Sequence, residues 1–325
     1  MRATTLSALT FTAAALLVLG ACSSDLPTGA DPASIAAARG GNGGGKGGGG
    51  KPGPTPAPDR IAYSEKAADG SINIFVVNAD GTGATAITST GMDYSPRWTA
   101  DHSRIVFVSD RDGIGHVYIM NADGSNPVRL TNTNYRDADP VPSPDGTHVV
   151  FQRNGAGVSG LYIMNMDGSA LARLNTADDA IQPAWSPDGQ SIAFVSYGGY
   201  AYQSIYMMSI YGTGLSLVDS CGSYPCLRPA FSPDGTRVAF WTSANNGEID
   251  WIALDKQSFA TIATNLGPMV LNAPAWSPDG TRIAFSKVSM VTGDEDLYSA
   301  ASADGSNATQ LTSATGLDAY PSWYR

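Results

Sequence analysis

Charged side chains are scarce in this chain, and basic ones are scarcer than acidic ones. Lysine and arginine number 19 against 29 aspartates and glutamates, which gives a formal net charge of −10. Charged residues make up 15% of the chain, well below the roughly 25% of an average soluble domain. Because nucleic-acid-binding domains carry a basic patch, this acidic balance argues against a nucleic acid as partner.

Cysteine and histidine are sparse as well, with three of each. Three cysteines are too few for a disulfide-rich scaffold or for a four-cysteine zinc site. The three histidines, His102, His116 and His148, fall on different parts of the repeats: one in a turn and two in different types of strand. A three-histidine metal site is therefore not expected, and we predict no metal and no cofactor.

No apolar run is long enough for a membrane helix. The alanine-rich run Leu6–Leu19 has 14 residues, too few to cross a bilayer core of about 30 Å, and it is typical of the hydrophobic region of a signal peptide. It ends in Leu-Gly-Ala-Cys22, which resembles a bacterial lipobox. The resemblance implies a signal peptide over residues 1–21, cleavage before Cys22 and lipidation of that thiol. The alternative is an ordinary signal peptide with an incidental cysteine.

The segment that follows the cysteine is dominated by glycine and proline. Ten of the 37 glycines lie between Gly40 and Gly53, and a proline-rich stretch follows them. Such sequences form flexible or extended linkers and cannot bury enough apolar surface to fold. We expect residues 22–58 to be a lipidated, disordered tether. Ser23 after the cysteine favours the outer membrane, by a sorting rule known for some bacteria, facing the periplasm or the cell surface.

Residues 59–325 form a repeat. A Ser-Pro-Asp-Gly block recurs, preceded by a degraded copy, with successive aspartates 43 to 46 residues apart. Repeats of this period are typical of propeller blades. Proline presets φ early in such a turn and glycine accepts the left-handed position that closes it. We therefore interpret these aspartates as structural, and the alternative is a repeated metal or catalytic carboxylate. They are Asp101, Asp145, Asp188, Asp234 and Asp279.

Each repeat contains four short segments rich in β-branched and aromatic residues, and six segments of each type fill residues 59–325. The region starts on a second strand, Arg60–Tyr63, and ends on a first strand, Tyr320–Trp323. The two ends can complete one shared blade, and such closure removes exposed sheet edges. The predicted fold is all-β: a closed six-bladed propeller of four-stranded antiparallel blades, with the C-terminal strand completing the first blade. We expect a monomer.

The repeating cycle resembles the TolB-type propeller. It runs Pro-x-Trp-Ser-Pro-Asp-Gly, Arg-Ile-Ala-Phe, Ile-Tyr-x-Met-Asn-x-Asp-Gly and Arg-Leu-Thr, and it covers residues 59–325. It departs at Ser209–Gly212 and at Ala253–Gln257, which replace the Asn-x-Asp-Gly turn. TolB itself carries an N-terminal α/β domain, whereas the tether occupies that place here. The resemblance therefore implies a TolB-like propeller lipoprotein and gives no support for a role in the Tol-Pal system.

The variable loops lie on the propeller face opposite the regular turns, and loops on a rigid scaffold often carry binding residues. One interpretation of their carboxylates is an acidic mouth that attracts a cation or a basic protein segment. The other is ordinary turn and solubility carboxylates. Tyrosines at 197, 200, 202 and 224 add amphipathic surface or simply pack within the loops. The candidate binding mouth consists of Asp93, Tyr94, Tyr135, Arg136, Asp137, Asp139, Asp178, Asp179 and Asp318.

Two further features bear on chemistry. Cys221 and Cys226 flank a four-residue loop, and in an exported protein we expect them to form a disulfide, the alternative being two reduced thiols. No Gly-x-Ser-x-Gly elbow is present, so we predict no enzyme, although an acid pair for glycoside cleavage among the mouth aspartates stays open. The predicted function is a membrane-anchored envelope module that presents a propeller face to a protein or peptide. The alternative is a surface glycan-binding or glycan-cleaving propeller.

Overall fold

The computed structural model describes residues 59–325 except 175–178, 267–272, 290–291, 314 and 325. The predictions for the signal peptide, for the lipidation of Cys22 and for the tether fall outside the described residues. Within the described part, no helix has the length and apolar character that a membrane span requires. A single short 3-10 helix, η2 (Ala244–Asn246), is found there, and the other elements are strands.

Four of the sheets are antiparallel and have four strands each. The first is built from β4 (Asp93–Trp98), β5 (Arg104–Ser109), β6 (His116–Asn121) and β7 (Val128–Arg129). The second is built from β8 (Arg136–Pro142), β9 (His148–Asn154), β10 (Gly160–Asn165) and β11 (Ala172–Arg173). The third is built from β12 (Ile181–Trp185), β13 (Ser191–Ser196), β14 (Ser204–Ser209) and β15 (Ser216–Asp219). The fourth is built from β16 (Cys226–Phe231), β17 (Arg237–Thr242), β18 (Glu248–Ala253) and β19 (Phe259–Thr264).

The remaining eight strands belong to one sheet that contains both ends of the propeller chain. One set is β1 (Arg60–Lys66), β2 (Ile72–Asn78), β3 (Thr85–Ala86) and β24 (Leu317–Tyr324). The other is β20 (Ala275–Trp276), β21 (Arg282–Val288), β22 (Glu295–Ala301) and β23 (Thr309–Gln310). A single parallel residue pair, Glu295 with Leu317, joins the two sets. The first strand, β1, pairs antiparallel with the last strand, β24.

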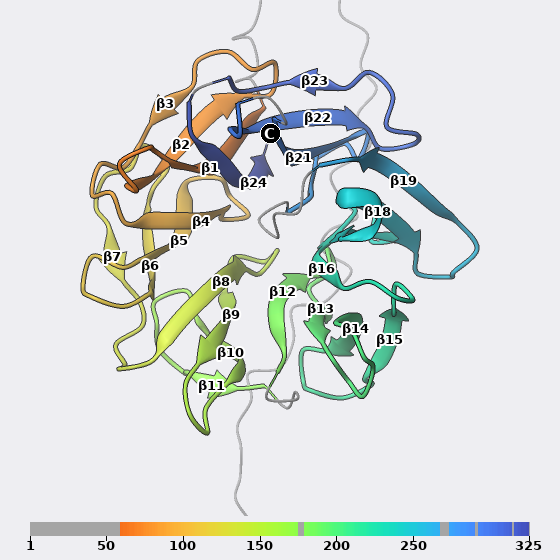
Figure 1. Ribbon diagram of the computed structural model, residues 1–325. Helices are drawn as coiled ribbons and strands as arrows, with labels where there is room; N and C mark the ends of the chain where they lie inside the picture. The colour runs from red at the N-terminus through yellow and green to blue at the C-terminus, as the bar shows by residue number, and fades with distance from the viewer. Residues whose placement is uncertain (1–58, 175–178, 267–272, 290–291, 314, 325) are drawn as a thin grey trace, which may run out of the picture. The chain divides into compact units, whose positions relative to one another are not determined.

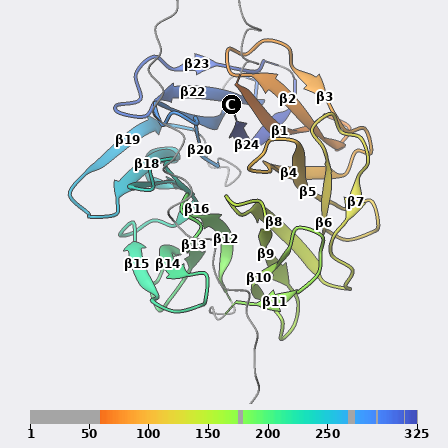
Figure 2. The same ribbon diagram turned by 180° about the vertical axis from the view of Figure 1, so that it is seen from behind.

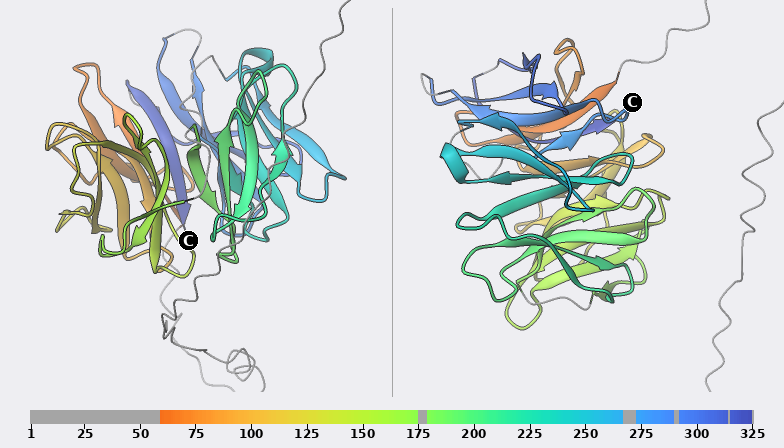
Figure 3. Two further views of the ribbon diagram at one scale, coloured as in Figure 1. Left: turned by 90° about the horizontal axis from the view of Figure 1, so that it is seen from below. Right: turned by 90° about the vertical axis from the view of Figure 1, so that its right-hand side faces the viewer.

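The sheets follow one another around a common centre in chain order (Figure 1), and the view from behind shows the same order reversed (Figure 2). β8, β12, β16 and β24 lie nearest the centre, and the side views show neighbouring sheets packed face to face (Figure 3). The predictions of an all-β propeller, of four-stranded antiparallel blades and of closure by the C-terminal strand are confirmed.

The core lies between adjacent sheets. Second strands such as β5 have a nearly continuous buried run, because both faces of a blade pack against neighbours. One cluster joins Val150 and Leu161 of the second sheet to Ile192 and Phe194 of the third. Burying one such side chain contributes about 1.5–3 kcal/mol, so each blade is stabilised mainly by contact with the next blade.

The turn aspartates serve the turns. The Ser143 hydroxyl donates to Asp145 Oδ1 at 2.5 Å, and the Thr147 backbone N–H donates to the same oxygen at 3.0 Å. Gly146 takes φ of +71° in the same turn, which a side chain would strain. The corresponding hydrogen bond from Ser232 lowers the pKa of Asp234 to about 2. These carboxylates accept local hydrogen bonds that hold the turns, which accounts for their recurrence in the sequence.

Candidate functional site in the central cavity

The innermost strands share a backbone irregularity where they approach the centre. In β4, Ser95 and Pro96 together face the single residue Phe107 of β5, which is a β-bulge. A non-glycine residue precedes the proline at the bulge of five innermost strands and adopts a positive φ of 48° to 60°. Such a conformation costs energy and is concentrated at functional sites. The five residues are Ser95, Asp139, Gln182, Arg228 and Tyr320.

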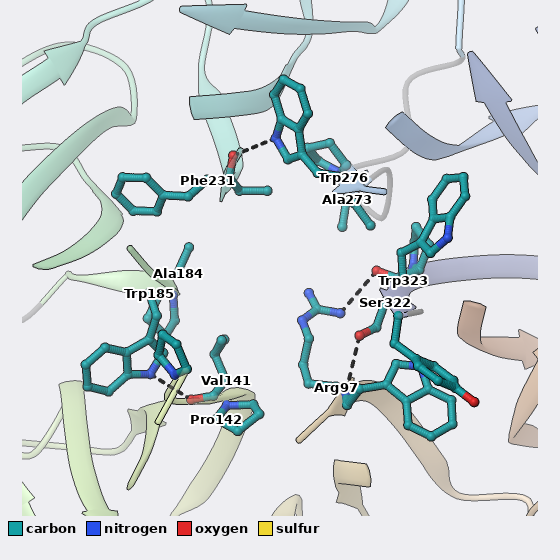
Figure 4. Close-up of a pocket in the computed structure, with 18 of the residues that line it drawn as sticks. Arg97, Val141, Pro142, Ala184, Trp185, Phe231, Ala273, Trp276, Ser322 and Trp323 are labelled. Carbon is teal, nitrogen blue, oxygen red and sulfur yellow. Dashed lines mark hydrogen bonds between the residues drawn. The ribbon is translucent and has the colours of Figure 1, made fainter. Parts of the chain in front are cut away.

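Around these bulges the innermost strands enclose a cavity of about 390 Å³, which we call the proline–tryptophan cavity. Prolines and aromatic rings from all the innermost strands form most of its wall, and prolines of the Ser-Pro-Asp-Gly turns reach its rim. Figure 4 shows the aromatic side chains arranged around an open centre. The aromatic members are Trp98, Trp185, Phe231, Trp276, Trp323 and Tyr324.

Hydrogen bonds between blades hold two of the tryptophans in place. The indole N–H of Trp185 donates to the Val141 carbonyl of the preceding blade at 3.0 Å. The Trp276 indole makes the same contact with the Ala230 carbonyl, also at 3.0 Å. Figure 4 shows both bonds at the cavity wall. A ring fixed in this way loses little conformational freedom when a ligand packs against it.

A polar cluster at the centre contributes Arg228 and Asp139 to the cavity wall. The Arg228 guanidinium donates to Asp139 at 2.5 Å and to the Tyr320 hydroxyl at 3.2 Å. Its carbon lies 4.7 Å from the Tyr320 ring centre, a cation–π contact. Burial opposes the charge on Arg228, but Asp139 and Tyr320 outweigh it and the pKa of Arg228 is raised. The cluster links three blades through residues up to 92 positions apart.

Arg97 lines the cavity without a direct ion pair among the described residues, although Asp139 is near enough to favour its charge. Its guanidinium donates only to the carbonyls of Pro96 at 3.0 Å and Pro321 at 3.4 Å, and Figure 4 shows the side chain extending into the open centre. No carboxylate forms an ion pair with it among the residues that the structure describes. Burial lowers the pKa of Arg97 to about 10, so the side chain stays charged at neutral pH. An incoming carboxylate would find a positive charge with unused donors.

Two of the predicted mouth aspartates are buried and paired with arginine. Arg111 donates to both carboxylate oxygens of Asp93, at 2.9 and 3.1 Å. Arg153 donates to both oxygens of Asp137, at 2.7 and 3.0 Å. Both aspartates have no exposed surface. They cannot form part of an exposed acidic ring, because their charges are already neutralised inside the blades.

Asp318 holds the position in β24 that corresponds to Asp137 in β8, and it has no arginine. It is 1% exposed, and among the described residues neither of its carboxylate oxygens has a partner at full hydrogen-bond geometry, although the nearby Thr312 side chain partly favours its charge. Its cross-strand neighbour is Glu65. Burial, followed by repulsion from Glu65, raises the pKa of Asp318 to about 7. The buried Glu295 has no partner at full hydrogen-bond geometry among the described residues, and burial raises its pKa to about 7 as well, although the Ser286 side chain partly opposes the rise.

The other predicted site residues are spread over separate places. The Tyr94 hydroxyl donates to Asp110 at 3.0 Å and accepts from Arg136 at 2.6 Å. Tyr135 is 38% exposed and lies 6.0 Å from the Arg153 guanidinium carbon. Asp179 accepts hydrogen bonds from Ser196 and from the Tyr197 backbone. Asp139 belongs to the central cluster, and Asp178 lies outside the described residues. The structure therefore brings together Tyr94 with Arg136, but not the nine residues as one mouth.

Sequence reasoning missed Arg97, Arg228 and the proline–tryptophan wall. An available clue was the recurrence of x-Pro-x-aromatic in the first strands, with two basic residues there in an acidic chain. The inward direction of the Arg97 and Arg228 side chains could not be predicted from the sequence. A β-bulge shifts the alternation of side chains between the two faces of a strand. The tryptophans were treated only as parts of the repeat.

Cys221 and Cys226 are joined by a disulfide bond. Asp219 lies close enough that the three side chains could have formed a metal-binding group. A metal needs deprotonated cysteine thiolates as ligands, and bonded sulfurs do not supply them. The bond instead closes a short loop next to the loop that ends at Gln203, whose carbonyl accepts the Cys226 backbone N–H at 2.9 Å.

Comparison with known proteins supports the TolB-like propeller expected from the repeat. The family model PD40, the TolB beta propeller domain, matches residues 38–156. No curated protein sequence matches this chain. The solved structure of TolB from Acinetobacter baumannii has a TM-score of 0.72 and 21% identity, covering 82% of this chain and 66% of that one. This chain thus spans about two thirds of the length of that TolB.

Two further structures widen the comparison. A protein assigned as TolB from Agrobacterium tumefaciens matches with a TM-score of 0.63 and 19% identity, over 80% of this chain and 91% of that one. Hydrazine synthase from Kuenenia stuttgartiensis matches with a TM-score of 0.64 and 14% identity, over 82% of this chain and 46% of that one. At such identities the likeness establishes the fold alone, because one fold serves many functions.

Proposed function

We propose that this protein is a non-enzymatic binding module that holds an extended peptide segment of a partner protein in the proline–tryptophan cavity. The observation that carries the proposal is the unpaired guanidinium of Arg97 inside a wall of prolines and fixed aromatic rings. Aromatic and arginine side chains dominate binding energy at protein interfaces. A peptide can offer apolar side chains to this wall and a carboxylate to Arg97.

The chemistry of the cavity selects the peptide. Arg228 is neutralised by Asp139, so Arg97 leaves one positive charge without a match. A carboxylate beside Arg97 would make charge-assisted hydrogen bonds, the strongest kind in proteins. We therefore expect a segment with one aspartate or glutamate flanked by apolar or proline residues. Two neighbouring acidic residues would add repulsion from Asp139.

The same cavity supports binding rather than catalysis. Its carboxylate, Asp139, is held by Arg228. The His102 ring at the rim lies 4.7 Å from the Tyr324 ring. General acid–base chemistry needs a titrating group within hydrogen-bond reach of the reacting atom and of a partner that orients it. The described cavity residues do not form such a pair, and we propose no reaction for it.

We further propose that the module works in the bacterial envelope as a lipid-anchored protein. The support is the lipobox-like sequence ending at Cys22 and the Cys221–Cys226 disulfide, since disulfides persist mainly in exported proteins. A palmitate-labelling assay with wild-type protein and Cys22→Ala tests this anchor. Label on the Cys22→Ala variant would contradict it.

We propose six blades for the ring. Four blades are separate sheets, and the eight-stranded sheet divides into two sets of four strands joined by one residue pair. Deleting Leu317–Arg325 should then open the ring and abolish cooperative unfolding, because β1 would lose its antiparallel partner. A truncated protein as stable as the intact one would contradict this closure.

A peptide array with systematically varied acidic positions tests the peptide proposal. We expect binders to need one carboxylate, and Arg97→Met to weaken them about tenfold or more, the loss of a charge-assisted hydrogen bond. Arg104→Met, at an exposed position of β5, is the matched control and should leave affinity unchanged. Binding that ignores Arg97, or binders without carboxylates, would refute the assigned site.

A second candidate, binding of a neutral glycan, rests on a different surface. Four tyrosines on two neighbouring loops are 45% to 48% exposed, namely Tyr197, Tyr200, Tyr202 and Tyr224. No charged residue occurs from Gly189 to Val218. Uncharged rings of this kind could stack on sugar rings. A glycan array with wild-type protein and Tyr200→Ala distinguishes the candidates, since glycan binding should depend on Tyr200 and not on Arg97.

A further inference from the structure

A second cavity lies between three blades, and no activity has been assigned to it so far. Its volume is about 260 Å³. Leu317, Ala319 and Ile72 provide an apolar surface, and the ring of Tyr320 belongs to the same wall. The hydroxyl of Tyr320 bonds to Arg228 of the central cluster, so this side chain stands between the two cavities. We call the second space the Tyr94 cavity.

The polar groups of the Tyr94 cavity are few and partly organised in advance. Arg136 donates to the Tyr94 hydroxyl at 2.6 Å and lies 3.6 Å from Asp110. Its guanidinium carbon is 5.9 Å from the Tyr94 ring centre. The Tyr94 hydroxyl in turn donates to Asp110 at 3.0 Å. Arg136 is therefore oriented by one ring and one carboxylate, while several of its N–H donors stay unused.

The backbone of Gly115 packs tightly against this arrangement. A Cβ atom added there would lie 3.1 Å from the Tyr94 hydroxyl and 3.2 Å from an Asp110 oxygen. It would also lie 2.9 Å from the Asp137 carbonyl. The bridge between Tyr94 and Asp110 is thus a packed feature of the fold, and a side chain at 115 would disturb it.

The charge of the Tyr94 cavity is opposite to that of the whole chain. Two of its three charged residues are basic, Lys66 and Arg136, against Asp110, whereas the chain carries a net charge of −10. Lys66 is exposed at the rim, and none of the described hydrogen bonds or ion pairs engages its ammonium group. With Asp110 balancing one of the two basic residues, the cavity keeps one net positive charge. It therefore favours a ligand with one negative charge over a ligand with two.

We infer that the Tyr94 cavity binds a monocarboxylate with a small branched apolar body. The carboxylate would lie between Lys66 and Arg136, and the body would rest on Leu317, Ala319 and the Tyr320 ring. Small-molecule sites commonly combine a mostly apolar wall with a few placed polar groups. The source of the ligand is either a free acid or the C-terminal residue of a peptide, since both present the same chemistry.

The decisive experiment compares an acid with its own amide on the intact propeller. Isothermal titration calorimetry with 4-methylpentanoate and 4-methylpentanamide is expected to show binding of the acid and none of the amide at millimolar concentration. N-acetyl-glycyl-leucine and its C-terminal amide form the peptide arm. Binding confined to the peptide acid assigns the site to chain termini, and binding of the free acid assigns it to small metabolites. If neither acid binds, or if the amides bind equally, the inference is wrong.

Variants locate the binding. Lys66→Gln and Arg136→Gln should each weaken the acid about tenfold, the effect of one charged hydrogen-bonding partner. Tyr94→Phe should weaken it less, because it only releases Arg136. Arg104→Gln is the matched control and should change nothing. Arg97→Met must keep the acid affinity, which separates this inference from the peptide proposal. The acid–amide comparison on wild-type protein stays decisive if a variant fails to fold.

Discussion

Two aspartates at the same position of two blades have opposite surroundings. Asp137 begins the bulged strand of the second sheet, and its cross-strand neighbour Arg153 neutralises it. Asp318 occupies the same position in the eight-stranded sheet, which contains both ends of the propeller and is called the closing sheet. Its cross-strand neighbour there is Glu65. A buried carboxylate needs a counterion or a proton. The buried charge of Asp137 is balanced by Arg153. Asp318, in the sheet where the chain ends meet, instead holds a proton more readily, because its pKa is raised to about 7.

The aromatic support for an arginine exists in both blades. Arg153 lies over the rings of Phe151 and Tyr162, at 5.3 and 4.7 Å from their centres. In the closing sheet, Tyr63 and Phe75 form the corresponding ring pair, with centres 5.6 Å apart. The difference between the blades is therefore one of charge at position 65 rather than of framework, and single substitutions can test it.

The largest effect is expected from removing the internal counterion. Arg153→Met should destabilise the protein by about 3–5 kcal/mol, because it leaves the fully buried Asp137 unpaired. Urea unfolding at neutral pH measures the loss. Arg104→Met, on the exposed surface, should stay within about 0.5 kcal/mol of wild type. A loss below about 1 kcal/mol for Arg153→Met would mean that Asp137 is hydrated or protonated instead.

The next effect concerns pH at the closing sheet. Asp318 and Glu295 have pKa values near 7 in the fold, above their ordinary values of 3.8 and 4.5. The fold then binds protons that the unfolded chain has lost, so stability falls as pH rises from about 4 to about 7 and levels off above. The groups that face this pair are Glu65, Tyr63, Asp296 and Ser286.

The double variant Asp318→Asn with Glu295→Gln should remove most of this slope. We expect it to gain at least about 2 kcal/mol over wild type at pH 8 relative to their difference at pH 4, since one pKa unit corresponds to about 1.4 kcal/mol and both pKa values are raised by more than one unit. Unfolding by urea at both pH values gives the four free energies. Parallel pH profiles for the two proteins would show that these carboxylates do not titrate in this range.

A smaller effect is expected from supplying the missing arginine. Glu65→Arg places a guanidinium opposite Asp318, over the ring of Tyr63, as Arg153 stands opposite Asp137. It should stabilise the protein by about 1–2 kcal/mol at pH 7 and flatten the pH profile, because the pKa of Asp318 would fall. Glu65→Gln is the control. It should give only the part of the stabilisation that comes from removing the repulsion between Glu65 and Asp318. A destabilised Glu65→Arg variant would show that the position does not accept the side chain.

The smallest difference in stability is expected between two tryptophan variants, one at Trp185 inside the ring and one at Trp98 beside the closing strand β24. The Trp185 indole N–H donates to Val141, whereas the buried Trp98 indole, which packs on the closing strand, has no partner among the described residues. Trp185→Phe should therefore cost about 1 kcal/mol more than Trp98→Phe, the contribution of one hydrogen bond. Thermal unfolding of both variants checks the difference. Equal costs would indicate that Trp98 bonds to water.

Much of the fold could be predicted because it depends on short-range chemistry. Turn residues and strand periodicity repeat about every 44 residues, and the strand types at both ends indicate the closure. The site could not be predicted in this way. Whether Asp137 meets Arg153 or Asp318 meets Glu65 depends on the register of strands. The inward turn of Arg97 depends on the left-handed Ser95 before it, which no residue preference indicates.

The bulges have a consequence for variation. Five blades place serine, aspartate, glutamine, arginine and tyrosine in the same left-handed conformation beside the centre. The same backbone shape thus occurs with five different side chains. Each of these five blades contributes one side chain of different chemistry beside the centre of the ring. A library randomised at Ser95, Asp139, Gln182, Arg228 and Tyr320 would change what the ring recognises while keeping its walls, as loop libraries do on antibody frameworks.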